Sequence, residues 1–195
     1  MSQIAEITKT SNARWLAGYY ATRAGFSAIW VAAAFSVGRS PSPLASALLV
    51  AYPAWDAVAN WRDASRNGGL RANPTQAFNA LVSTVVTIAV VLAIAYDIQA
   101  VLYVFGIWAS LSGLLQLATG IRRWSGFSAQ WPMILSGAQS ALAGVIFVKK
   151  AASGTGVPSG VDIAPYAAFG AIYFGISALA SSISVARRRR AVVTT

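Results

Sequence analysis

Arg23 and Asp56 are charged residues placed well inside long apolar stretches of this sequence. A charge in hydrocarbon is costly, and such residues usually pair with one another or face a water-filled cavity. Counted at the helical rise from Trp15 and Trp61, Arg23 lies about 12 Å and Asp56 about 7–8 Å from the same membrane surface. An arginine side chain can bridge that difference, so we predict a buried Arg23–Asp56 ion pair, which the guanidinium group favours by its forked geometry.

Other polar side chains fall at similar depths in the same half of the apolar stretches, and most of them are amides. This predicted polar layer consists of Asn60, Gln76, Asn79, Ser83, Gln116 and Gln130. One interpretation is a polar vestibule open to one side of the membrane. The other, which we favour, is a buried ion pair with amide cross-links that fix the register of the helices. Asp63 is near the pair in sequence, but we expect it to lie in a loop.

The residue types for most enzymatic chemistry are missing. The chain has no histidine and no cysteine, and its five acidic residues are scattered. Histidine is the commonest general base, and a thiolate or a cysteine-ligated metal needs cysteine. No glycine-rich phosphate-binding motif occurs. We therefore expect a protein that is not an enzyme, with no cofactor and no metal site.

The elements that carry these residues are long apolar segments. The chain is 56% hydrophobic and 10% charged, with a mean hydropathy of +0.58, whereas soluble domains average about 25% charged residues. About 20 apolar residues cross a bilayer as a helix. The predicted fold is an all-α integral membrane protein, one domain over residues 1–195 with six transmembrane helices. The approximate spans are 15–38, 42–61, 75–96, 98–121, 126–148 and 164–186.

The distribution of positive charge predicts the orientation. Of the 15 basic residues, 11 lie before the first span, between spans two and three, between spans four and five, or after span six. Arg39, Lys149 and Lys150 lie on the other side. A bias of basic residues in short loops marks the cytoplasmic face. Both termini are therefore expected in the cytoplasm, in a multi-pass protein of the cell's inner membrane.

The connections differ in length and composition. Asp97 alone separates spans three and four, which predicts a tight helical hairpin. The connection from Lys149 to Pro165 is the longest, and its glycine, serine and proline content predicts flexibility. A weak 3+3 internal repeat is indicated by alanines 84 residues apart, as in transporters with inverted repeats. The matched alanines are Ala54, Ala57 and Ala59 with Ala138, Ala141 and Ala143.

Small residues recur at intervals that place them on one face of a helix, and such faces let backbones approach closely. We expect helix packing at Gly25, Gly106, Gly113, Gly137, Gly144 and Gly175.

Two glycine-spaced segments carry a resemblance to a known family. GIWASLSGLLQLATGIRR at Gly106–Arg123 and LSGAQSALAGVIF at Leu135–Phe147 resemble segments of the HdeD-like family of small six-helix bacterial membrane proteins. The resemblance covers Val101–Arg188 best and is poorer over the first two spans. It implies a bacterial inner-membrane protein linked to stress, and it carries no catalytic residues with it.

Two functions remain open. The first is a non-enzymatic membrane protein in stress response, or an accessory or assembly subunit of a larger membrane complex. The second is a small oligomeric transporter or channel built on the layer around Arg23 and Asp56. The expected partners are membrane lipids, with anionic lipid at Arg187–Arg190, and either a homo-oligomer or a larger membrane complex. We do not expect a nucleic-acid partner, because the positive charge is distributed by membrane side.

Overall fold

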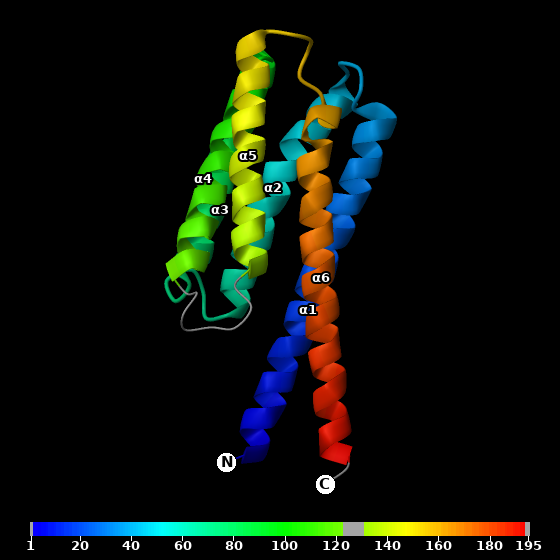
Figure 1. The fold of residues 1–195 in the computed structure, drawn as a ribbon, viewed down its shortest axis with the longest axis vertical. Helices are drawn as coiled ribbons and strands as arrows, with labels where there is room; N and C mark the ends of the chain where they lie inside the picture. Colours follow the sequence, from blue (N-terminus) through cyan, green and yellow to red (C-terminus); the bar gives the residue numbers. More distant parts are fainter. Residues whose placement is uncertain (1, 123–130, 194–195) are drawn as a thin grey trace. The chain divides into compact units, whose positions relative to one another are not determined.

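The computed structural model describes residues 2–122 and 131–193, which form six helices and no strand (Figure 1). The helices are α1 (Ser2–Val37), α2 (Pro43–Arg66), α3 (Pro74–Tyr96), α4 (Ala100–Arg122), α5 (Trp131–Ser153) and α6 (Gly160–Val193). The all-helical prediction is confirmed.

Several helix ends lie beyond the predicted spans. α1 begins at Ser2, and α6 continues to Val193, because polar and alanine-rich ends can remain helical outside an apolar layer. α2 continues to Arg66, since the first helix-breaking residue after it is Gly68.

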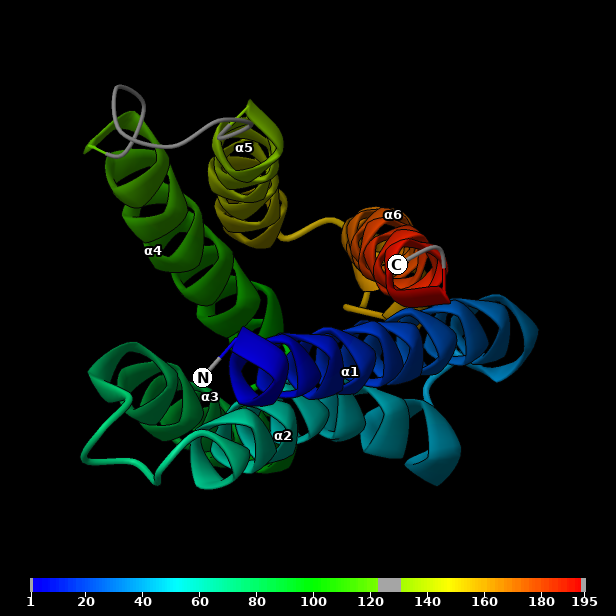
Figure 2. The same cartoon turned by 90° about the horizontal axis from the view of Figure 1, so that it is seen from below.

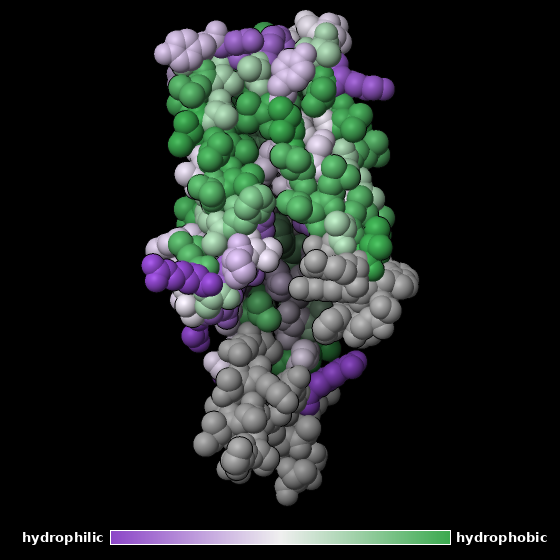
Figure 3. Space-filling view, turned by 90° about the vertical axis from the view of Figure 1, so that its left-hand side faces the viewer, coloured by the Kyte–Doolittle hydropathy of each residue, from purple (hydrophilic) through white to green (hydrophobic). Residues whose placement is uncertain are grey.

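Among the described residues, three helical segments are long and apolar enough to cross a membrane: α3, Ala100–Ala118 within α4, and Gly160–Arg187 within α6. Large apolar side chains are exposed along one face of α3, among them Leu81, Val85 and Ile88. Figure 3 shows the α3–α4 side as a hydrophobic surface between hydrophilic margins. These features are typical of a membrane protein. Six spans and cytoplasmic termini remain predictions.

Two hydroxyl groups of α3 are satisfied by the helix itself. Thr84 and Thr87 on α3 donate to the carbonyls of Ala80 and Ser83, each over 2.7 Å. Such bonds to the preceding turn are a way for a hydroxyl to be accommodated without water.

The contacts of the chain divide it into two compact units. Unit 1 contains α1 up to Ile29 and α6 from Ala167, and unit 2 contains Trp30–Tyr166. The prediction of one domain stays a prediction. In unit 1, the ring of Tyr20 on α1 stacks on Phe174 of α6, with centroids 6.3 Å apart.

Unit 2 is built by helices that follow one another along the chain. α2 packs on α3, α3 on α4, and α4 on α5 (Figures 1 and 2). Its core holds an aromatic cluster whose ring centroids lie 5.0–6.4 Å from their neighbours. The cluster consists of Trp30, Tyr52, Phe105, Trp108, Phe147 and Tyr166. The indole N–H of Trp30 also donates to the carbonyl of Leu48 over 2.7 Å, which joins the end of α1 to α2.

The connection between α5 and α6 differs from its prediction. α5 continues through Ser153 and α6 starts at Gly160, so the connection is shorter than Lys149–Pro165. Lys149 and the residues up to Ser153 are mostly good helix formers, which extends α5.

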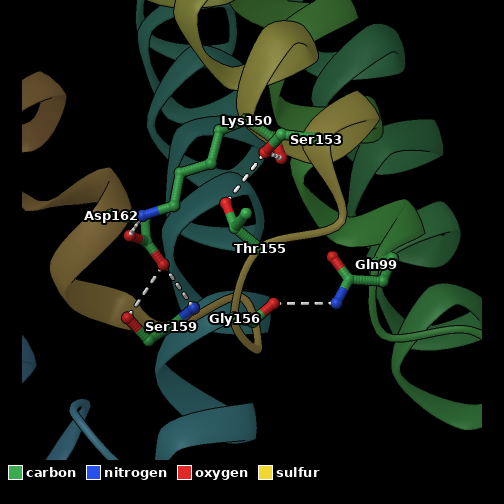
Figure 4. A network of polar contacts seen from close by, with 7 residues as sticks. All are labelled: Gln99, Lys150, Ser153, Thr155, Gly156, Ser159 and Asp162. Atoms are coloured by element: carbon green, nitrogen blue, oxygen red, sulfur yellow. Dashed lines mark hydrogen bonds and ion pairs between the residues drawn. The ribbon is translucent and has the colours of Figure 1, made fainter.

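This connection is also held by polar contacts rather than left loose (Figure 4). Lys150 pairs with Asp162, whose other carboxylate oxygen accepts from the backbone N–H and the hydroxyl of Ser159. The amide of Gln99 donates to the carbonyl of Gly156 over 2.8 Å. The composition that predicted flexibility therefore also supplies the groups that organise the connection.

The connection between α2 and α3 is organised by a single side chain. Gly68 has φ +97°, and the N–H of Gly69 donates to the carbonyl of Ala64 over 2.8 Å, as in a Schellman end. The side-chain amide of Asn73 donates to the carbonyl of Asn67 over 2.7 Å and to that of Gly69 over 2.9 Å. One amide thus satisfies carbonyls that would otherwise need water.

Candidate functional site

Polar residues form one stripe along α2 and a second along α3. On α2 and its C-cap they recur at intervals of three or four residues: Asp56, Asn60, Asp63 and Asn67. On α3 the spacing is similar: Gln76, Asn79, Ser83 and Thr87. Residues at such intervals share one face of a helix. The two stripes meet where α2 packs on α3, and we call this contact the polar seam.

Asp56 lies at the first contact of the polar seam. Its Oδ2 accepts from the hydroxyl of Ser83 on α3 over 2.8 Å and from Nδ2 of Asn60 over 3.0 Å. Ser83 is 1% exposed and Asn60 is 7% exposed. Two neutral donors therefore hold this carboxylate at the α2–α3 contact, and charged acceptors make such bonds strong.

Asp63 lies at the second contact. Its Oδ2 accepts from Nε2 of Gln76 over 3.3 Å, and its Oδ1 accepts from Nδ2 of Asn67 over 2.9 Å. Asp63 follows Asp56 by seven residues, and Gln76 precedes Ser83 by seven, so both contacts share one antiparallel register.

Our prediction that Asp63 belongs to a loop was wrong. Asp63 lies within α2, because the helix ends only at Arg66. Sequence reasoning missed its role, although the spacing of Asp56, Asn60 and Asp63 was the signal that could have found it.

The remaining amides of the predicted layer are placed separately. Asn79 is half-buried on α3, and the register of the polar seam sets it level with Asn60. Gln116 is exposed on α4, where its Oε1 accepts from the hydroxyl of Ser136 on α5 over 3.4 Å. The amides therefore serve two different helix contacts. Gln130 lies outside the described residues.

Arg23 lies in unit 1, where its guanidinium group meets aromatic rings. Its Nη1 donates to the hydroxyl of Tyr19 over 2.9 Å, and its Cζ lies 4.2 Å from the centroid of Phe174 on α6. A cation over an aromatic face is attracted by the ring quadrupole. Because Asp56 belongs to unit 2, the Arg23–Asp56 pair stays a prediction.

Four of the predicted packing glycines meet at the contact of α4 with α5, which we call the glycine crossing. A Cβ on Gly113 would lie 2.5 Å from the carbonyl oxygen of Gly137, and a Cβ on Gly144 would lie 2.5 Å from that of Gly106. The glycines of each helix are seven residues apart, and Gly106 faces Gly144 as Gly113 faces Gly137. If α4 and α5 change places, Gly106 takes the position of Gly137 and Gly113 that of Gly144, so each contact becomes the other. The glycine crossing therefore has local two-fold symmetry.

Gly25 and Gly175 are placed differently. A Cβ on either would meet nothing within 4 Å among the atoms of the described residues. These two glycines do not permit a close backbone approach of the kind seen at the glycine crossing.

Comparison with known proteins gives one finding. Residues 78–149 match the family model described as a short repeat of unknown function (DUF308). HdeD-like proteins belong to this family, so the match supports that part of the resemblance. The matched segment contains the whole glycine crossing and most of α3. Searches of curated proteins and of solved structures found no match.

Proposed function

We propose that this chain is a non-enzymatic, HdeD-like protein of the bacterial inner membrane, with six spans and both termini in the cytoplasm. It acts in stress response or as an accessory or assembly subunit of a larger membrane complex. The polar seam carries this proposal, because both carboxylates of α2 are bonded to neutral donors of α2 and α3. Groups bonded in this way join helices, as buried hydrogen bonds in membrane proteins do.

The side chains of the polar seam suit the joining of helices better than they suit catalysis. General acid–base work would need a group whose pKa lies near the operating pH, and histidine is absent from the chain. The expected activity of the purified protein is therefore none, with or without added metal ions or cofactors.

Reporter fusions test the proposed orientation. A reporter that is active only outside the cytoplasm should be silent when fused after Thr195 and active when inserted at Gly156, in the α5–α6 connection. The reverse pattern would refute the orientation, and activity at both sites would show that α6 does not cross the membrane.

The accessory role is tested in native membranes. Solubilised in mild detergent, the chain should migrate in a complex larger than any oligomer of itself, at a fixed ratio to its partner subunits. A chain that is recovered only as a monomer or homo-oligomer would contradict an accessory role.

A second candidate is a small oligomeric transporter or channel, with the layer around Arg23 and Asp56 as its polar site. The observation in its favour is that Asp56 and Asp63 share one stripe of α2, about 10 Å apart along the helix. Ion flux in proteoliposomes tests it. Flux above that of empty liposomes, abolished by Asp56→Asn at normal folded yield, would establish this candidate and overturn the first.

A further inference from the structure

The exposed face of α2 changes from apolar to basic toward its end. Val58 and Trp61 are 52% and 56% exposed, and exposed Arg62 and Arg66 follow them. From Trp61 to Arg66 the helix rises about 7.5 Å. Tryptophan prefers the boundary between hydrocarbon and headgroups, and arginine reaches the phosphates beyond it.

The exposed face of α3 shows the same change in the opposite chain direction. Leu81 and Phe78 are 62% and 51% exposed, and Arg71, just before the helix, is exposed as well. In the register of the polar seam, Phe78 lies level with Trp61 and Leu81 lies level with Val58. The two helices therefore change from apolar to aromatic to basic at matching levels.

We infer that the α2–α3 connection binds the headgroup of an anionic phospholipid. Arg62, Arg66 and Arg71 contact the headgroup phosphates, while Trp61 and Phe78 lie at the upper end of the acyl chains. A guanidinium group presents a fork of donors that matches phosphate oxygens, and each basic residue near an anionic surface strengthens binding. This inference rests on the proposed membrane location and adds a lipid site to it.

The connection, which carries Arg71, is already held by hydrogen bonds, and Arg62 and Arg66 lie on the last turns of α2. Asn73 bonds to the carbonyls of Asn67 and Gly69, and Gly69 bonds back to Ala64. Little ordering of the backbone is then needed when a lipid binds, which favours affinity.

A lipid fits this surface better than a free phosphate ion. Leu70 is 41% exposed beside Arg71, and Trp61 is 56% exposed beside Arg62. An inorganic ion would gain nothing from these apolar groups, whereas acyl chains would cover them.

The experiment measures lipid selection by the full chain in nanodiscs of phosphatidylcholine and phosphatidylglycerol. Native mass spectrometry gives the enrichment of phosphatidylglycerol among the bound lipids. At about fivefold per arginine near an anionic surface, R66Q should lower the enrichment by about fivefold, and R62Q/R66Q/R71Q should lower it to the level that Arg187–Arg190 supplies. R39Q is the matched control, since Arg39 is exposed in unit 2 beside Phe35, and should leave the enrichment unchanged.

Further variants and a competing ion distinguish a lipid site at the α2–α3 connection from a site at Arg187–Arg190 and from a general anion site. R62K/R66K/R71K keeps the positive charge and should retain most of the phosphatidylglycerol enrichment. This variant also tests the site if the glutamine triple variant folds poorly. If the glutamine triple variant keeps full enrichment, or if replacing Arg187–Arg190 alone removes it, the site is not at this connection. Displacement by millimolar inorganic phosphate would show a general anion site and overturn the assignment to lipid.

The outcome is distinguishable from failure of the proposed function. Every variant should stay in the membrane after alkaline carbonate extraction, because the apolar faces hold it there. Release of the unmodified chain by carbonate would refute the membrane location, whereas loss of lipid selection alone concerns only this site.

Discussion

Two regions of the protein carry glycines at the same spacing and use them in opposite ways. Gly106 and Gly113 of α4 are seven residues apart, as are Gly18 and Gly25 of α1. At the glycine crossing, a Cβ would overlap the backbone of α5, whereas a Cβ on Gly18 or Gly25 would meet nothing within 4 Å of it among the described atoms. Glycine spacing on one helix therefore does not identify a packing face. The second helix must supply glycines at the matching positions, as Gly137 and Gly144 do.

The contact between α1 and α6 in unit 1 uses large side chains in place of glycine. Phe174 receives the guanidinium group of Arg23 at 4.2 Å and the ring of Tyr20 at 6.3 Å. Such contacts depend on ring position and charge, and they tolerate small shifts of the backbone. A glycine contact is close-packed, so the addition of one methyl group is felt.

The largest expected effect is the loss of stability on replacing Arg23 of unit 1 or Asp56 of unit 2. Arg23→Ala and Asp56→Ala should each destabilise the protein by about 3–5 kcal/mol if the two residues form the predicted buried pair. The neutral double variant should recover part of the loss, measured by unfolding in detergent as a double-mutant cycle. Strictly additive losses would show that Arg23 depends on its aromatic contacts alone.

Gly113→Ala should come next, with a loss of about 3 kcal/mol, because the new methyl group meets the backbone of Gly137 and Ala141. Gly106→Ala should cost less, since the nearest backbone atom to its Cβ would be the carbonyl oxygen of Gly144 at 2.9 Å, farther away than the backbone atoms that a Cβ on Gly113 meets. Thermal unfolding in detergent measures both. Little or no loss at either position would mean that the backbones separate freely and that the close approach is not needed.

Phe174→Leu should cost about 1–2 kcal/mol, because it removes a cation–π contact and a ring stack while keeping an apolar side chain. The same unfolding assay applies. Phe169→Leu is the matched control, since Phe169 is 46% exposed on α6. A loss at Phe169 as large as that at Phe174 would indicate a general effect of removing rings from α6.

Gly25→Ala and Gly175→Ala should have the smallest effects, below about 1 kcal/mol and in the stabilising direction, because alanine is the better helix former. Both sites have room for the added methyl group. A loss comparable to that of Gly113→Ala would show that these positions contact another surface, such as a second copy of the chain.

The sequence was sufficient for the helices and for the glycines of α4 and α5. Apolar runs bounded by Pro74 and Asp97 predicted α3 to within one residue of its start, since proline and a capping turn limit a helix sharply. Ends without such residues, as at Arg66 and Ser153, lie beyond the predicted spans, because good helix formers carry a helix past its apolar part.

The candidate site was predicted only in part. Depth alone grouped Asn60, Gln76 and Gln116, but the structure gives Gln116 to the α4–α5 contact. The depth of a residue gives its position along the membrane normal. It does not say toward which neighbouring helix the side chain points. The helical spacing that links Asp56 to Asp63 supplies that direction, and it predicts the polar seam once it is read along both helices.

The polar seam also bears on how the chain enters the membrane during synthesis. An aspartate in an inserting helix costs up to about 2.5–3.5 kcal/mol, the value at the helix centre, and Asp56 lies inside the proposed span of α2, with Asp63 just beyond Trp61 at its end. Their donors Ser83 and Gln76 come from α3, which follows after the short connection held by Asn73. For a chain in which α2 is a span, as we propose, α2 inserts less readily while it is alone at the ribosome's exit. The hydroxyl of Ser83 offsets part of this cost when α3 emerges, so we expect the two helices of the proposed hairpin to leave the translocon together.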